Sequence, residues 1–77
     1  MDNERVVWLA RSSGGLSYAI LLNECDASRW ADDVEVYWDG DRLAWFDKDS
    51  NIVENVLGVE LSPGEYCPVQ INIKNML

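Results

Sequence analysis

Residues 5–22 read RVVWLARSSGGLSYAILL, and this stretch decides the fold because it predicts a buried β-hairpin. Its first half is rich in β-branched and aromatic side chains, which favour a strand. Ser12–Gly15 supplies the turn, since glycine tolerates the positive φ that tight hairpin turns require. If Gly14 and Gly15 form the loop, the facing pairs are Val7–Leu22, Leu9–Ile20 and Arg11–Tyr18.

Both faces of this hairpin are apolar. The face opposite Leu9 carries Val6, Trp8, Ala10, Ala19 and Leu21. A strand that is apolar on both sides is typical of a position covered on both sides, so we expect the hairpin to be the most buried part of the chain. A short helix over Ser17–Glu24 is the alternative, because periodicity does not separate a helix from a strand in so brief an apolar run.

A helical turn and a second hairpin are expected next. Asp26 can cap a short helix over residues 27–31, and we expect Trp30 to cover the sheet as a lid. Residues 34–38 (VEVYW) alternate like a strand, and Asp39-Gly40 is a strong hairpin turn signal. A two-residue loop places Val36 opposite Leu43 and Val34 opposite Trp45, whereas a three-residue loop, Asp39–Asp41, shifts this register.

Two further strands are predicted in the C-terminal half. Residues 47–51 (DKDSN) are typical of a turn, and Ile52–Leu61 reads as a long strand bent at Gly58. Ser62–Glu65 (SPGE) fits a type II turn. Val69–Lys74 alternates, and we expect an edge strand there because Pro68 cannot donate to a ladder.

These elements predict one domain over residues 1–77. The expected fold is mainly β: a small antiparallel sheet, barrel or sandwich of five to six strands with one short helical turn. An α+β arrangement is the alternative.

Composition excludes several functions. The 77 residues include no histidine, 14 acidic residues and 6 basic ones, for a net charge of −8. Without histidine the commonest general base and most zinc sites are missing, so we expect no enzyme, no cofactor and no metal site. The charge disfavours direct binding to nucleic acid or to anionic membranes. No segment reads as a signal peptide or membrane span, and the expected location is cytoplasmic, with Cys25 and Cys67 reduced and partly buried.

Acidic residues concentrate between Trp30 and Asp49. This stretch holds seven carboxylates and three of the four tryptophans, with Arg42 and Lys48 as its only bases. Carboxylates fixed on a rigid hairpin would form a ridge that suits a groove lined with lysine and arginine. The predicted partner-binding residues are Asp32, Asp33, Glu35, Tyr37, Asp39, Asp41, Asp47 and Asp49.

The segments Asp32–Glu35 (DDVE) and Trp38–Asp41 (WDGD) place dense acid on an expected hairpin. In this, in its size and in its β-rich pattern the chain resembles small acidic phage-encoded anti-defence proteins, which include anti-CRISPR inhibitors and DNA mimics. The resemblance implies a non-enzymatic inhibitor in the host cytoplasm that occupies a basic nucleic-acid-binding surface of a target protein, such as a CRISPR or other defence effector. The alternative is a protein–protein interaction or accessory module, such as an immunity-like protein or small subunit, whose acids mainly give solubility.

Overall fold

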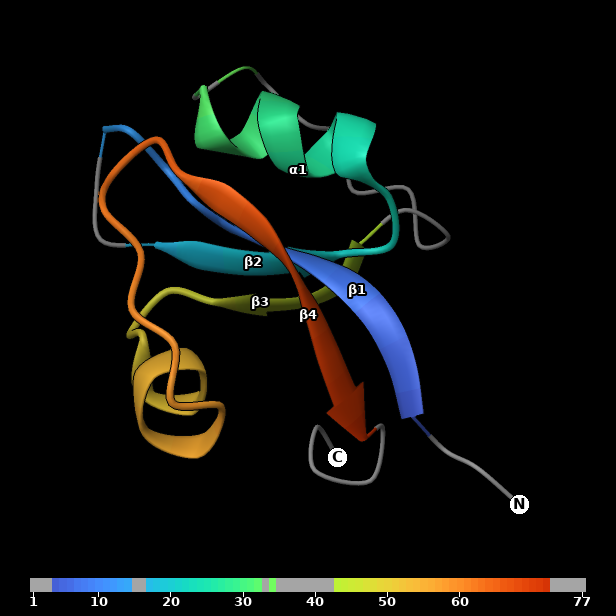
Figure 1. Ribbon diagram of the computed structural model, residues 1–77. Helices are drawn as coiled ribbons and strands as arrows, with labels where there is room; N and C mark the ends of the chain where they lie inside the picture. The colour runs from blue at the N-terminus through green and yellow to red at the C-terminus, as the bar shows by residue number, and fades with distance from the viewer. Residues whose placement is uncertain (1–3, 15–16, 33, 35–42, 73–77) are drawn as a thin grey trace.

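A four-stranded antiparallel sheet with the strand order β3-β2-β1-β4 forms the body of the described chain (Figure 1). The computed structural model describes residues 4–14, 17–32, 34 and 43–72. In chain order the elements are β1 (Glu4–Arg11), β2 (Tyr18–Leu21), α1 (Glu24–Ala31), β3 (Leu43–Asp47), the π-helical turn η1 (Ile52–Val56) and β4 (Tyr66–Asn72). The mainly β class is confirmed. The sheet is open, and the expected barrel or sandwich of five to six strands is not confirmed.

The N-terminal hairpin has the predicted register. Leu9 pairs with Ile20 and Arg11 pairs with Tyr18, and all four residues of β2 are buried. The alternative helix over residues 17–24 is wrong, because β2 lies between β1 and β3 and is covered on both faces.

Two hydrophobic clusters lie on opposite faces of the sheet, as the two-sided pattern predicts. The cluster between the sheet and α1 is built from small side chains and Leu21, namely Ala10, Ala19, Leu21, Ala27 and Ala31. The cluster on the η1 side contains larger groups, namely Val7, Leu9, Tyr18, Ile20, Val53, Leu61 and Ile71. Figure 1 accordingly places α1 on one side of the sheet and the gold coil of η1 on the other.

The helix begins three residues before the position expected. Asn23 is the N-cap: its backbone is extended, and its side-chain Oδ1 accepts the Asp26 N–H at 2.9 Å. Asp26 therefore lies inside the first turn, where it is buried, accepts a hydrogen bond from Asn23 Nδ2 at 3.0 Å and lies 3.9 Å from Arg29. Trp30 packs on the α1-side cluster, with its ring edge-on to Phe46 at 5.3 Å, which agrees with its expected place over the sheet.

The second hairpin lies mostly outside the described residues, so its turn and register stay predictions. Val34, expected in its first strand, instead donates its N–H to Arg29 O at 2.9 Å just beyond α1 and lies in no strand. Residues 43–47 do form β3, but β3 pairs with β2, and Trp45 lies opposite Ile20.

The predicted strand over residues 52–61 is wrong. Its first half is η1, closed by the Leu57 N–H donating to Ile52 O at 3.0 Å, and the second half is extended but joins no ladder. Capping by a side chain explains the difference, because the Asp47 carboxylate at the end of β3 accepts the N–H groups of Ile52 and Val53 and so favours a helical turn after residues 48–51. Gly58 then reverses the chain at φ +70°, a conformation that glycine adopts without strain.

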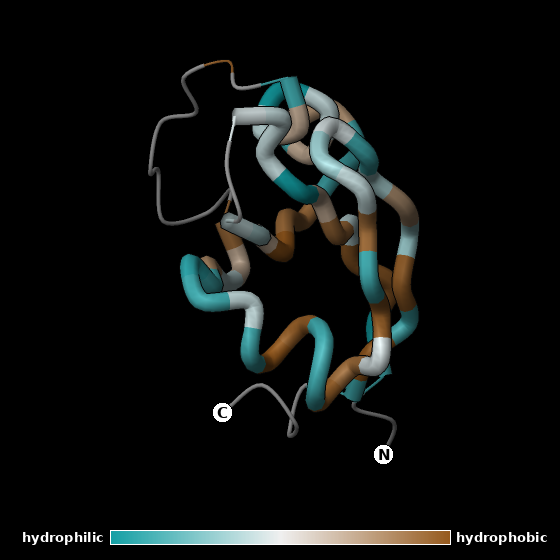
Figure 2. The backbone as a smooth tube through the Cα atoms, turned by 90° about the vertical axis from the view of Figure 1, so that its left-hand side faces the viewer, coloured by the Kyte–Doolittle hydropathy of each residue, from teal (hydrophilic) through white to brown (hydrophobic). Residues whose placement is uncertain are grey.

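The remaining turn and the edge position of the last strand agree with the sequence, but β4 begins at Tyr66, three residues before the predicted start at Val69, and residues 73 and 74 lie outside the described part of the chain. Glu65 N–H donates to Ser62 O at 3.0 Å across the predicted turn, in which Gly64 has φ +86°. β4 is an edge strand, and hydrophobic and hydrophilic residues alternate along it in Figure 2. Within the described ranges, no helix is long and apolar enough to cross a bilayer.

Candidate functional site

The structure describes three of the eight predicted partner-binding residues. Asp32 is exposed at the C-terminal end of α1, and Asp49 is exposed in the turn after β3. Asp47 is buried, with 7% of its surface exposed. The other five predicted residues lie outside the described part of the chain, namely Asp33, Glu35, Tyr37, Asp39 and Asp41.

Asp47 organises the turn that follows β3. Its Oδ1 accepts the Asp49 N–H at 3.1 Å, and its Oδ2 accepts the Ile52 N–H at 2.9 Å and the Val53 N–H at 3.4 Å. It thereby satisfies two backbone donors at the start of η1 and one in the preceding turn. Asp47 thus contributes its charge to the internal structure of the turn and offers little of it to a partner.

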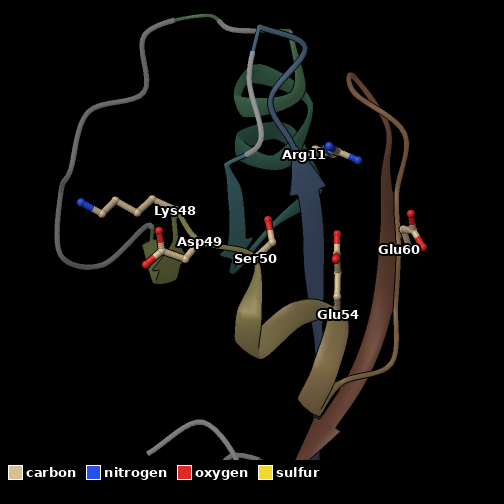
Figure 3. Close-up of a pocket in the computed structure, with 6 residues that line it drawn as sticks. All are labelled: Arg11, Lys48, Asp49, Ser50, Glu54 and Glu60. Carbon is tan, nitrogen blue, oxygen red and sulfur yellow. The ribbon is translucent and has the colours of Figure 1, made fainter.

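A polar depression of about 500 Å³ opens beside this turn (Figure 3). It lies between the end of β1, the turn after β3, η1 and the extended segment before β4. Its lining combines two cations, three carboxylates and a hydroxyl group, from Arg11, Lys48, Asp49, Ser50, Glu54 and Glu60. Of these the sequence singled out Asp49 alone. Glu54 and Glu60 were missed because residues 52–61 were interpreted as a strand, which cannot fold back over the end of β1.

A hydrogen-bond network forms the floor of this depression. The Tyr18 hydroxyl accepts the Leu61 N–H at 3.1 Å and donates to Glu54 Oε2 at 2.9 Å. Arg11 Nη1 donates to Leu61 O at 2.6 Å, and the guanidinium lies 5.4 Å from the centre of the Tyr18 ring. The side chains of Tyr18 and Arg11, one buried and one partly buried, therefore hold three segments together. These segments are the β1–β2 hairpin, η1 and residue 61.

Burial shifts the acidity of two groups in the molecule. Desolvation raises the pKa of Tyr18 above 10.0, and the hydrogen bond to the Glu54 carboxylate raises it further, while the Leu61 N–H and Arg11 act the other way. Burial also raises the pKa of the half-buried Cys67 thiol, with a smaller contribution from Glu65. Both cysteines are free, as expected, but Cys25 is exposed on α1, so partial burial holds for Cys67 only.

The exterior of the described residues is strongly acidic. Two of the four described cations are used internally, because Arg11 bonds Leu61 O and Arg29 lies beside buried Asp26. Arg5 and Lys48 are the cations that are exposed. Seven carboxylate residues of the described ranges are exposed, namely Glu4, Glu24, Asp32, Asp49, Glu54, Glu60 and Glu65.

An apolar strip lies on the α1 face of β1 and β4. Val6 is 59% exposed and Tyr66 is 39% exposed, and Trp8 and Pro68 form the pair between them. The rings of Trp8 and Tyr66 are 6.1 Å apart. These four residues, the β1–β4 strip, form a second feature that a partner could contact.

Among the described residues, no three or more cysteine, aspartate or glutamate side chains gather in a way that could hold a metal ion. Comparisons of the chain with protein-family models, with curated proteins and with solved structures gave no match.

Proposed function

We propose that this protein is a non-enzymatic acidic binding protein that docks on a basic, nucleic-acid-binding surface of a target protein, such as a CRISPR or other defence effector. One observation carries the proposal: seven exposed carboxylates of the described residues are accompanied by two exposed cations. The acidic excess lies at the surface, because Arg11 and Arg29 are engaged within the molecule and Asp26 and Asp47 are the buried acids among the described residues.

The carboxylates around the depression are held in fixed positions, which favours recognition of a partner. Asp49, Glu54 and Glu60 surround the depression on separate segments, and the Tyr18 and Arg11 hydrogen bonds fix two of these segments to the sheet. A lysine or arginine side chain of the target would meet three carboxylates there, together with Arg11 and Lys48, so the lining keeps a net charge of −1 (three carboxylates less two cations). Charge complementarity of this kind speeds association and weakens as salt is raised.

The predicted acidic stretch belongs to the same proposal. Asp32 and Asp49 are exposed and remain candidate contacts, together with Asp33, Glu35, Tyr37, Asp39 and Asp41 of the expected hairpin. Asp47 is left out, because its carboxylate already accepts three backbone hydrogen bonds.

The test is capture on the immobilised protein, followed by competition. Proteins retained from a host lysate at about 0.1 M NaCl are challenged with about 1 M NaCl, which shortens the Debye length from about 10 Å to about 3 Å. They are challenged separately with duplex DNA and with RNA. A target whose nucleic-acid groove is occupied is released by salt and by one of the nucleic acids. A retained protein that resists both would contradict the proposal.

Charge-neutral variants locate the contact. Asp39→Asn combined with Asp41→Asn tests the expected hairpin, and Glu54→Gln combined with Glu60→Gln tests the depression. The matched control is Glu24→Gln combined with Glu4→Gln, which removes the same charge elsewhere. Retention of the target should fall for at least one of the two test pairs and stay near the wild-type level for the control. Equal loss in all three pairs would mean that net charge alone determines binding.

The β1–β4 strip supports a second function, that of an interaction or accessory module in which the acids mainly give solubility. Val6 and Tyr66 offer apolar surface to a partner without charge. A complex formed there would tolerate about 1 M NaCl, because apolar contacts are not screened. Val6→Lys would weaken such a complex while leaving a complex of the acidic surface intact.

A further inference from the structure

The outer edge of β4 carries backbone groups that no described strand pairs with. The Arg11 N–H donates to Glu65 O at 2.9 Å and Arg11 O accepts the Gly64 N–H at 3.0 Å, so the Glu65 carbonyl faces β1 at the end of the β1–β4 ladder. Bonded and non-bonded pairs alternate along an antiparallel ladder. The outward-facing groups therefore belong to Tyr66, Pro68 and Gln70, and Pro68 lacks the N–H that its neighbours offer.

β4 is also free of charge. None of its seven residues is charged, whereas exposed edge strands are commonly protected by charged side chains. Pro68 is its one edge-protecting residue. Cys67 and Val69 are half-buried against the η1-side cluster, and Tyr66 and Pro68 are exposed on the other face. A strand that fits beside β4 should itself be uncharged, with apolar side chains on the η1 side of the sheet.

β4 meets that requirement, and we propose that two copies of this chain associate by antiparallel pairing of their β4 strands into one continuous eight-stranded sheet. Tyr66 of one copy lies opposite Gln70 of the second copy, and Pro68 lies opposite Pro68 of the second copy at the two-fold axis. This register joins the outward-facing groups of both strands and makes four hydrogen bonds. It goes beyond the proposed function, because it uses an uncharged edge on which the acidic surface does not depend.

Two features set the strength of this dimer. Pro68 withholds the two hydrogen bonds that another residue at the axis would provide. Each copy also carries a net charge of −8, so the copies repel one another at low salt. The dimer is therefore weak and concentration-dependent, and it strengthens as salt is raised from about 0.1 M to about 1 M. Binding to a basic target should instead weaken as salt is raised.

Sedimentation equilibrium over micromolar to millimolar concentrations measures the dimer, and paired variants test the edge. Pro68→Thr restores the outward N–H and should tighten the dimer about tenfold, since it adds two hydrogen bonds. Gln70→Pro removes an outward N–H without touching the β1 ladder and should weaken the dimer by about the same factor. Gln70→Ala is the control, because it removes the side-chain bond to Glu4 and keeps the backbone donor. Circular dichroism and thermal melts of the dilute proteins establish that each variant is folded.

Cross-linking tests the register. In a background of Cys25→Ser and Cys67→Ala, Pro68→Cys places two thiols opposite each other in a hydrogen-bonded pair, where the Cα atoms are about 5.5 Å apart and a disulfide fits. Gln70→Cys places its thiol opposite Tyr66 of the second copy and should cross-link much more slowly under mild oxidation. Faster cross-linking of Gln70→Cys would overturn the register.

Two results would overturn the dimer itself. One is a monomeric mass at every concentration and salt, for the wild type and for Pro68→Thr. The other is a dimer that responds to neither Pro68→Thr nor Gln70→Pro. Either result leaves the acidic surface unaffected, because release of a basic target by salt and nucleic acid is measured on dilute, immobilised protein.

Discussion

Replacing Tyr18 by phenylalanine removes one oxygen atom from the hydrogen-bond network at the floor of the depression. Tyr18 is 0% exposed, and phenylalanine fills nearly the same volume, so packing around the ring is retained. What is lost is the acceptor of the Leu61 N–H and the donor to Glu54. The variant should therefore be folded but less stable.

The size of the effect follows from which partner remains buried. Leu61 is itself buried, and leaving its N–H without an acceptor costs about 1–3 kcal/mol. Glu54 is exposed and regains water, so its lost bond adds little. For a domain of this length, the melting temperature should fall by about 4–8 °C for each kcal/mol.

Urea unfolding at neutral pH measures the free energy directly, with tryptophan fluorescence as the signal. Tyr66→Phe is the matched control: its ring is 39% exposed beside Trp8, and its unfolding free energy should stay within about 0.5 kcal/mol of the wild type. A loss below about 0.5 kcal/mol for Tyr18→Phe would refute the reasoning, because Leu61 would then have another acceptor.

The same pair of variants has a distinct alkaline signature. Because the pKa of Tyr18 is raised in the folded state, the unfolded chain ionises first as pH rises. Stability from this group is fully present below the ordinary tyrosine pKa of 10.0 and is lost as pH rises through the higher folded value. Tyr18→Phe should remove this part of the alkaline loss, and Tyr66→Phe should keep it. Identical profiles of unfolding free energy against pH for the wild type and Tyr18→Phe would contradict this expectation.

Three further substitutions test local structure, each by urea unfolding. Asp47→Ala should destabilise by about 1–3 kcal/mol because backbone donors at the start of η1 lose their acceptor, whereas exposed Asp49→Ala should change stability little. Asn23→Ala removes the α1 cap and should cost about 1 kcal/mol; no loss would mean that another group caps the helix. Gly58→Ala should cost about 1–2 kcal/mol through its φ of +70° alone, because an added Cβ meets no atom within 4 Å, and an unchanged stability would show that the turn adopts another conformation.

Local patterns predicted the parts of the fold that local chemistry determines. The register of β1 and β2 follows from a short turn between two apolar runs, and the edge position of β4 follows from the missing N–H of Pro68. The interpretation of residues 52–61 was wrong because their β-branched content favours a strand, while the acceptor that starts η1, Asp47, lies outside that segment.

The candidate site was harder to predict for the same reason. Its acidic character is visible in composition, and Asp49 was identified from the sequence. The depression, however, brings Arg11 beside Glu54 and Glu60, which are far away along the chain. Only the return of the extended segment to the sheet, through Leu61, brings these groups together. The hydrophobic periodicity of a single segment does not predict such a contact between distant segments.

The alanine-lined contact between α1 and the sheet has a mechanical consequence. The methyl groups of Ala10, Ala19, Ala27 and Ala31 have no rotamers, so much of the distance between the helix and the sheet is fixed by side chains that cannot adjust. Glu24 and Asp32 lie at the two ends of α1. Their positions are therefore fixed by the buried alanines beneath the helix. Replacing any one of these alanines by a larger residue would tilt α1 and move the Glu24 and Asp32 carboxylates together.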